Sequence, residues 1–202
     1  MKEWFENKTV AVVGNAQSLK SKNYGKEIDS HDVVVRINRG ISASDMHTNS
    51  FGKKTNVWMF NLYNDKLKSF HSSLSIDNKY YKMQMNYDKN NRNFDYSYPK
   101  EYYLELFSYF DPKKPTTGIR CLHYISKCNP KSVDVYGFDW KETPTFYDRY
   151  ANDSQHDYAK EKEYCINHFF SNGLFVLKWI FINIVYDRNL LKESLNGRKN
   201  KT

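Results

Sequence analysis

The sequence predicts an α/β protein, a single domain built on a mostly parallel central sheet. Several short apolar runs rich in β-branched residues are separated by segments long enough for crossover helices, which is typical of parallel strands covered on both faces. The chain has 202 residues, of which 40% are hydrophobic and 27% charged. That length and composition suit one globular domain, 1–202, with its own core.

Four apolar runs in the first half are predicted strands. They lie at residues 9–13, 32–37, 56–60 and 79–84. The segment between the first two carries Leu19 and Ile28 among polar residues, which fits a short crossover helix. Residues 88–97 are rich in Asn, Asp and Lys, so we expect a surface loop there.

Helices and one more strand are predicted in the second half. A helix is expected to follow Pro99, because apolar residues recur at helical spacing as far as Phe110. A second helix, capped by the hydroxyls of residues 116 and 117, would carry Ile119, Leu122, Ile125 and Cys128. Residues 132–138 are predicted to return to the sheet as a strand, and residues 156–170 to form a helix.

The most apolar stretch of the chain, residues 174–186, is also predicted to be a helix. It is too short to span a membrane and it contains Lys178. It would be either buried or interfacial, in which case the stretch from Leu174 to Thr202 would contact a membrane surface. Residues 187–202 form a basic tail, expected to be disordered or close to the membrane.

The charge and the cysteines exclude several classes of protein. A net charge of +8 favours an anionic partner, and no nucleic-acid-binding motif accompanies it. The cysteines Cys121, Cys128 and Cys165 are odd in number and lack metal-site spacing, so we expect reduced thiols and no metal. The first eight residues are too charged for a signal peptide, which predicts the cytoplasm.

A nucleotide site is predicted where the first strand ends in Gly14 and Asn15, because the N–H groups at a helix start attract phosphate. The other glycines of a dinucleotide-binding fingerprint are missing after Gly14, and the chain has no P-loop sequence. NAD and P-loop ATP chemistry are therefore disfavoured.

Four segments carry short motif-like patterns, in this order along the chain: residues 10–38, residues 114–138 with a Thr-Gly turn and a Tyr-Gly-Phe strand end, residues 146–148, and His156 with Glu161. Together they resemble the motifs of the sialyltransferases with eukaryotic-type sialylmotifs, glycosyltransferase family 29. In the same order, they are similar to the family's long nucleotide-binding motif, its short motif, its small aromatic–acid motif and its final motif. The resemblance covers roughly residues 9 to 165 and favours a bacterial-type soluble member.

The resemblance implies a Rossmann-like variant of the GT-A glycosyltransferase fold and an inverting, metal-independent reaction. The donor would be a CMP-activated sialic acid or a related acidic sugar such as Kdo. The acceptor would be a glycan hydroxyl, free or lipid-linked, as in a lipopolysaccharide or capsule, and the enzyme could lie at the inner face of the membrane. The chain lacks an Asp-x-Asp sequence of the kind that holds a divalent cation beside a diphosphate donor.

By the same resemblance, His156 would be the general base, supported by Glu161. The donor would be bound by a further set of residues, namely Gly14, Asn15, Ser18, Asn38, Thr116, Thr117, Gly118, Gly137, Phe138 and Tyr147. Simpler roles remain open, since the two threonines could be helix caps and the two asparagines turn residues.

Two departures from the family pattern stand out. Val10 replaces the cysteine that would pair with Cys128, and Thr145 replaces a frequent histidine of the third motif. Two other functions also stay open: a transferase that uses another nucleotide sugar, and a non-catalytic module that binds a nucleotide or a glycan.

Overall fold

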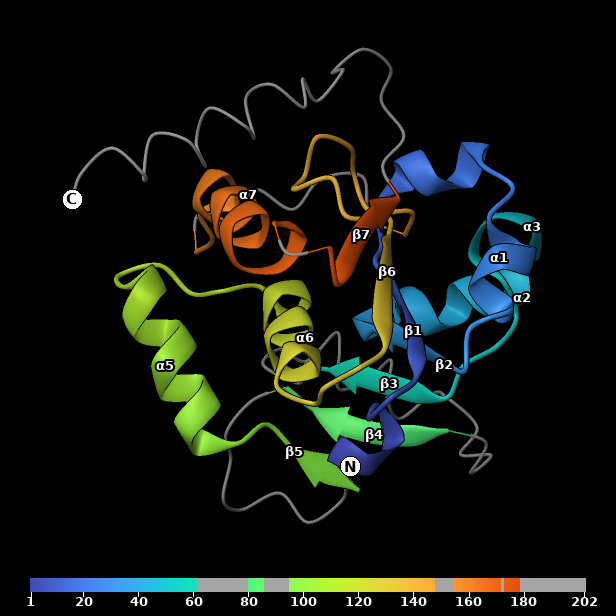
Figure 1. Cartoon of the computed structure of the whole chain (residues 1–202). Coiled ribbons are helices and arrows are strands. Elements are labelled where there is room, and N and C mark those ends of the chain that lie inside the picture. Colours follow the sequence, from blue (N-terminus) through green and yellow to red (C-terminus); the bar gives the residue numbers. More distant parts are fainter. Residues whose placement is uncertain (62–79, 86–94, 148–154, 172, 179–202) are drawn as a thin grey trace, which may run out of the picture.

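The computed structural model describes residues 1–61, 80–85, 95–147, 155–171 and 173–178 (Figure 1). These residues form a seven-stranded sheet of order β5-β4-β3-β2-β1-β6-β7, in which every pairing is parallel. The predicted α/β class with a parallel central sheet is confirmed. The strands are β1 Thr9–Val13, β2 Val33–Ile37, β3 Val57–Phe60, β4 Tyr81–Gln84, β5 Tyr96–Ser97, β6 Ser132–Tyr136 and β7 Phe175–Lys178.

The strand order reverses direction beside β1. Val10 of β1 pairs with Val33 of β2 on one side and with Val133 of β6 on the other. The chain first builds the sheet outward from β1 through β2, β3, β4 and β5, and then returns to place β6 and β7 on the opposite side. In an open α/β sheet, ligands bind at such a reversal, outside the carboxyl ends of the strands.

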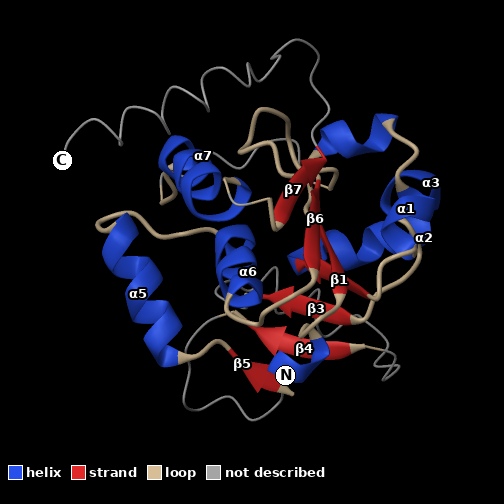
Figure 2. Cartoon of the chain, viewed as in Figure 1, coloured by secondary structure: helices blue, strands red, loops and turns tan. Residues whose placement is uncertain are grey.

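Helices cover both faces of the sheet (Figure 2). Alternate residues of β1 face opposite sides: Val10 and Val12 belong to one core cluster, whereas Ala11 and Val13 belong to another. The helical segments are η1 Lys2–Trp4, η2 Gln17–Ser21, α1 Gly25–Asp29, η3 Asn38–Ser42, α2 Ala43–Met46, α3 Thr48–Phe51, α5 Lys100–Phe110, α6 Thr117–Ser126, α7 Tyr158–Cys165 and η4 Ile166–Phe170.

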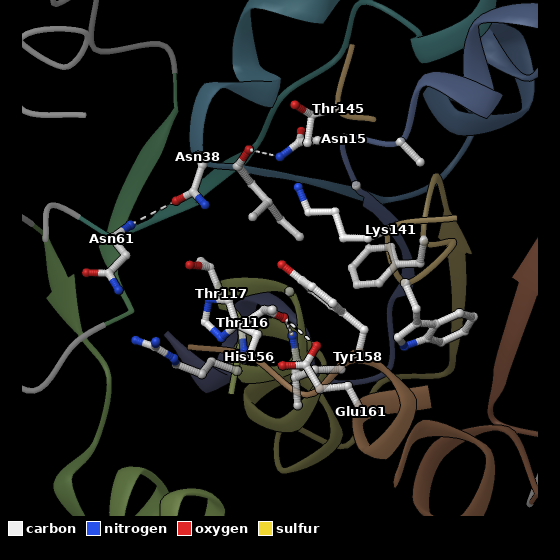
Figure 3. Close-up of a pocket in the computed structure, with 18 of the residues that line it drawn as sticks. Asn15, Asn38, Asn61, Thr116, Thr117, Lys141, Thr145, His156, Tyr158 and Glu161 are labelled. Carbon is white, nitrogen blue, oxygen red and sulfur yellow. Dashed lines mark hydrogen bonds between the residues drawn. The ribbon is translucent and has the colours of Figure 1, made fainter. Parts of the chain in front are cut away.

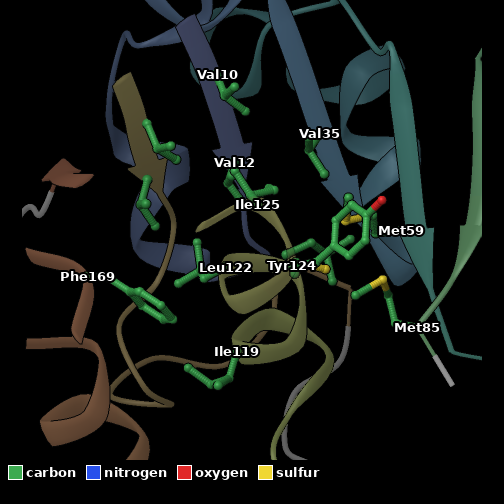
Figure 4. Packing of buried hydrophobic residues seen from close by; sticks show 14 of the residues in the cluster. Val10, Val12, Val35, Met59, Met85, Ile119, Leu122, Tyr124, Ile125 and Phe169 are labelled. Atoms are coloured by element: carbon green, nitrogen blue, oxygen red, sulfur yellow. The ribbon is translucent and has the colours of Figure 1, made fainter. Parts of the chain in front are cut away.

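Helix α6 is the best buried of these helices and lies directly on the sheet (Figure 4). Its predicted apolar residues Ile119, Leu122 and Ile125 are at most 1% exposed and share a cluster with Val10 and Val12. Full burial of such a side chain stabilises the fold by about 1.5–3 kcal/mol. This packing fixes the position of the N-terminus of α6 relative to the carboxyl ends of the strands.

The prediction of a helix at residues 174–186 is wrong over the part of that segment that the structure describes, which ends at residue 178. Phe175–Lys178 is the edge strand β7, which pairs in parallel with β6 from Val133 to Tyr136. A short apolar run does not distinguish a strand from a buried helix, and here a free edge of β6 decided the outcome. Residues 179–202, including the basic tail 187–202, lie outside the described residues.

The loop predicted at residues 88–97 is wrong at its end, where Tyr96–Ser97 forms β5 beside Met83 of β4. Two helices also have limits that differ from the prediction. Pro99 is the N-cap of α5 rather than part of its first turn, and Cys128 lies beyond the last residue of α6. The three cysteines are buried thiols, as expected. Over the described ranges, no helix is long and apolar enough to cross a membrane.

Candidate active site

A cavity of about 540 Å³ lies where β1, β2, β3 and β6 end (Figure 3). Every site residue predicted from the sequence lines it, with the exception of Ser18. These residues come from all four segments that resemble the family motifs. They are Gly14, Asn15, Asn38, Thr116, Thr117, Gly118, Gly137, Phe138, Tyr147, His156 and Glu161.

Two of the glycines allow close packing around the Phe138 ring. A Cβ on Gly14 would lie 2.4 Å from the Gly137 carbonyl oxygen and 2.8 Å from the Phe138 ring, and a Cβ on Gly118 would lie 2.8 Å from the same ring. Gly137 itself has a φ of 64°, a conformation that favours glycine. The ends of β1 and β6 and the start of α6 therefore meet at one aromatic side chain.

Asn15 ties three segments together. Its Nδ2 donates to the Ile37 carbonyl at the end of β2 and to the Tyr147 hydroxyl, each at 3.2 Å. Its Oδ1 lies against Gly40, where a Cβ would come within 2.0 Å of it. The polar side chain predicted to hold nucleotide therefore also fixes the wall of the cavity.

Asn38 adopts a left-handed conformation with φ 48°, which asparagine tolerates better than most residues. Its backbone carbonyl accepts a hydrogen bond from Trp58 Nε1 at 2.6 Å, and its Oδ1 accepts one from the Asn61 N–H at 3.0 Å. Both oxygens of Asn38 therefore already accept hydrogen bonds. The side-chain NH₂ group is left as a hydrogen-bond donor toward the cavity. The sequence analysis missed Asn61, although it directly follows β3 as Asn38 directly follows β2.

The N-terminus of α6 opens onto the cavity. Thr116 is its N-cap, and the Thr116 hydroxyl oxygen accepts a hydrogen bond from the Ile119 N–H at 3.3 Å. Thr117 and Gly118, in the first turn, also line the cavity. A helix N-terminus carries partial positive charge and unpaired N–H groups, so an anionic ligand is favoured here.

Glu161 lies beneath this helix start and is 2% exposed. Its carboxylate accepts two hydrogen bonds from Thr116, one from the backbone N–H at 2.6 Å and one from the hydroxyl at 2.9 Å. Burial raises the pKa of Glu161 to about 8, although the Thr116 hydrogen bonds act in the opposite direction. Glu161 is therefore placed to support α6.

His156 lies immediately before Asp157, the N-cap of α7. The spacing of five residues thus brings His156 and Glu161 to the same end of one helix. His156 Nδ1 lies 2.5 Å from the Lys114 carbonyl oxygen, and because a carbonyl only accepts, Nδ1 carries the proton. In the neutral ring, Nε2 then has the lone pair that a general base needs.

The charged groups that line the cavity are mainly cationic. The cationic set comprises Arg39, Lys114, Arg120 and Lys141, against the carboxyl groups of Asp139 and Glu161. Sequence reasoning missed the arginines and lysines, because nothing in their spacing distinguishes them from surface residues. An excess of positive charge in a cleft favours an anionic substrate.

Ser18, predicted to contact the nucleotide, is not part of the cavity lining. Its hydroxyl donates to Asp139 Oδ2 at 3.0 Å, and its N–H donates to the Thr143 hydroxyl oxygen at 3.2 Å. These bonds anchor the segment that follows β6 to the segment that follows β1. Ser18 therefore holds residues that line the cavity without lining it itself.

Sequence comparison finds relatives over part of the chain. Residues 4–96 match the model of glycosyltransferase family 29 (sialyltransferase). The CMP-N-acetylneuraminate-beta-galactosamide-alpha-2,3-sialyltransferase 1 of Mus musculus is 62% identical over 29 residues, which are 14% of this chain and 9% of that protein. The type 2 lactosamine alpha-2,3-sialyltransferase of Rattus norvegicus is 42% identical over 53 residues, which are 26% of this chain and 15% of that protein.

Structural comparison extends the likeness to most of the chain. A mammalian sialyltransferase superposes with a TM-score of 0.64 at 18% identity, covering 85% of this chain and 68% of that one. The monofunctional alpha-2,3-sialyltransferase Cst-I of Campylobacter jejuni superposes with a TM-score of 0.58 at 15% identity, covering 97% and 96%. At such identities the likeness shows a shared fold. The predicted resemblance is confirmed: residues 4–96 match the model of glycosyltransferase family 29, and the chain shares its fold with sialyltransferases.

Proposed function

We propose that this chain is an inverting glycosyltransferase that moves sialic acid, or a related acidic sugar such as Kdo, from a CMP donor to a glycan hydroxyl. One observation carries the proposal. Segments that are far apart in sequence and resemble four motifs of one family line a single cavity at the reversal of the strand order. The family match itself ends at residue 96, so this convergence is independent support from the rest of the chain.

His156 is the base in this mechanism. The Lys114 carbonyl orients the ring through Nδ1–H, so Nε2 accepts the proton of the acceptor hydroxyl as its oxygen attacks the anomeric carbon. The bond from that carbon to the phosphate oxygen breaks on the opposite face, and its electron pair leaves with CMP. The sugar is transferred with inversion, and His156 then returns its proton to water.

The cavity supplies charge where the reaction needs it. The donor carries a phosphate and a sugar carboxylate, and the leaving CMP gains negative charge in the transition state. The first turn of α6 and the surrounding cations favour both anions. CMP leaves with a single phosphate, whereas a divalent cation typically accompanies a diphosphate donor. The proposal therefore includes that transfer requires no metal ion.

Glu161 acts through Thr116 in this proposal and is a positioning residue. Its two hydrogen bonds to Thr116 hold the start of α6 against α7. His156 precedes α7 and Thr117 begins α6, so this contact sets the separation between the base and the anion-binding helix start.

Galactose-terminated glycans are the acceptors to test first. The mouse relative is named for a beta-galactosamide acceptor and the rat relative for a lactosamine, and an exposed galactose hydroxyl meets the needs of a base-assisted attack. A lipid-linked acceptor and a membrane contact of the segment from Leu174 to Thr202 stay predictions, because most of that segment lies outside the described residues.

The test is turnover of CMP-sialic acid by the purified chain with a panel of β-galactosides, in the presence of EDTA. The proposal expects a sialylated product and stoichiometric CMP. CMP binding without turnover would instead favour the non-catalytic binding module. Binding and turnover of a UDP-sugar, but not of CMP-sialic acid, would favour a transferase with another donor.

A further inference from the structure

The segment that follows β6 makes a tight turn of an unusual kind. The Glu142 N–H donates to the Asp139 carbonyl at 2.9 Å, and the two residues between them, Trp140 and Lys141, have φ of 47° and 67°. Two successive positive φ values are the pattern of a type I′ turn, in which Asn-Gly is preferred. Each non-glycine residue held there costs of order 1 kcal/mol or more.

Neighbouring contacts hold this turn in place. The Asp139 carboxylate, which is 4% exposed, accepts hydrogen bonds from the Ser18 hydroxyl at 3.0 Å and from the Thr143 hydroxyl and N–H. The Trp140 side chain packs against the main core, and the Lys162 ammonium lies 5.7 Å from its ring centre. The surroundings therefore impose a conformation that the local sequence disfavours.

The consequence of the turn is the position of Lys141. Its side chain is exposed and extends into the cavity (Figure 3). Among the residues that the structure describes, none forms an ion pair or hydrogen bond with its ammonium group. A strained turn that presents a cation to a cleft is the arrangement expected where strain serves binding.

Most other cations of the cavity are already engaged. The Arg120 guanidinium donates to the carbonyls of Pro115 and Met85, at 2.8 to 3.1 Å. The Arg39 guanidinium lies 4.6 Å from the centre of the Tyr147 ring. Lys114 is exposed and belongs to the segment that holds His156, whereas Lys141 belongs to the segment that holds Gly137 and Phe138, where the nucleotide is expected.

We propose that Lys141 binds the phosphate of the CMP moiety and stabilises its negative charge as the donor bond breaks. This assignment rests on the proposed function. As the bond between the anomeric carbon and the phosphate oxygen breaks, its electron pair moves onto that oxygen, and the CMP phosphate becomes more negative. A cation already placed in the cleft lowers the energy of that state without reorganisation.

Calorimetry with CMP and with cytidine tests the assignment, because cytidine lacks the phosphate. Lys141→Ala is expected to weaken CMP binding about tenfold or more while leaving cytidine binding unchanged, and Lys141→Arg is expected to retain most of the CMP affinity. Lys131→Ala, at the opposite ends of the strands, is the matched control and is expected to bind CMP as the wild type does.

A glycine variant separates binding from folding. Lys141→Gly is expected to lose CMP affinity as Lys141→Ala does, yet to unfold at a higher temperature than the wild type, because glycine adopts the positive φ without strain. Parallel losses for CMP and cytidine, or CMP binding that is unchanged in Lys141→Ala, would overturn the assignment. An unchanged affinity for CMP with a weakened affinity for the intact donor would also overturn it and point to the sugar carboxylate.

The outcome for the wild type distinguishes the two proposals. A wild-type chain that binds no CMP contradicts the proposed function, and this assignment with it. A wild-type chain that binds CMP, beside a Lys141→Ala variant that binds it equally well, contradicts the assignment alone.

Discussion

The Glu161 carboxylate accepts both hydrogen bonds that Thr116 directs toward α7, from its N–H at 2.6 Å and from its hydroxyl at 2.9 Å. The same hydroxyl oxygen accepts the Ile119 N–H and so caps α6. Residues that are 45 positions apart in the chain thus join the helix that follows His156 to the helix start that opens onto the cavity. The contact makes the spacing of the cleft depend on one buried carboxylate.

Thr116→Val is expected to destabilise the fold by about 2–3 kcal/mol, because it removes a helix cap and leaves a buried carboxylate oxygen without its donor. Urea unfolding measures this change. Thr116→Ser keeps the hydroxyl and is expected to lose less than half as much. Equal losses in the two variants would contradict this account, because the hydroxyl would then contribute no more to stability than the methyl group does.

The Glu161 carboxyl predicts a pH dependence of stability. Its pKa rises from 4.5 in the unfolded chain to about 8 in the fold because of burial. Between these values the folded state binds more protons than the unfolded state, so the contribution of Glu161 to stability is full below pH 4.5 and declines as pH rises through 8. Glu161→Gln removes this titration.

Chemical denaturation at pH 5 and at pH 8.5 measures the effect. The difference in unfolding free energy between the two pH values is expected to include a loss in the wild type that is absent in Glu161→Gln. Comparing the two proteins removes the contributions of other titrating groups such as His47 and His123. The same pH profile in both proteins would contradict a raised pKa at Glu161.

Gly40→Ala is expected to weaken nucleotide binding through Asn15. A Cβ at residue 40 would lie 2.0 Å from Asn15 Oδ1, so the amide would leave its bonds to the Ile37 carbonyl and the Tyr147 hydroxyl. CMP affinity should fall about tenfold, as for the loss of one or two hydrogen bonds. Asn15→Ala is the comparison variant, and a Gly40→Ala protein that binds CMP like the wild type would show that this placement of Asn15 is dispensable.

The sequence predicts the interior strands of the sheet better than it predicts the two edge strands, β5 and β7. The runs that became β1, β2 and β3 are almost continuously apolar and buried, which is typical of the interior of a parallel sheet. The edge strand β7 was mistaken for a helix, since its conformation depends on pairing with β6, a contact that local pattern does not encode. The two-residue strand β5 is too short to leave any pattern.

The candidate site was predicted in part for a similar reason. Residues just after the ends of strands, such as Asn15 and Asn38, are recognisable because parallel strands bring their carboxyl ends together, and the same rule would have found Asn61. Lys141 was not recognisable, because it enters the cavity only through a turn that the anchored carboxylate of Asp139 imposes. Thr116 was correctly assigned as a possible cap, and its second role became visible only through its contact with Glu161.

The most direct test of the central claim compares His156→Ala with the wild type, with donor hydrolysis and transfer to a β-galactoside measured separately. A chain that uses His156 as its base should lose transfer by 10²-fold or more. Its affinity for CMP, measured in parallel, should remain close to that of the wild type. Transfer at the wild-type rate by His156→Ala would contradict the account.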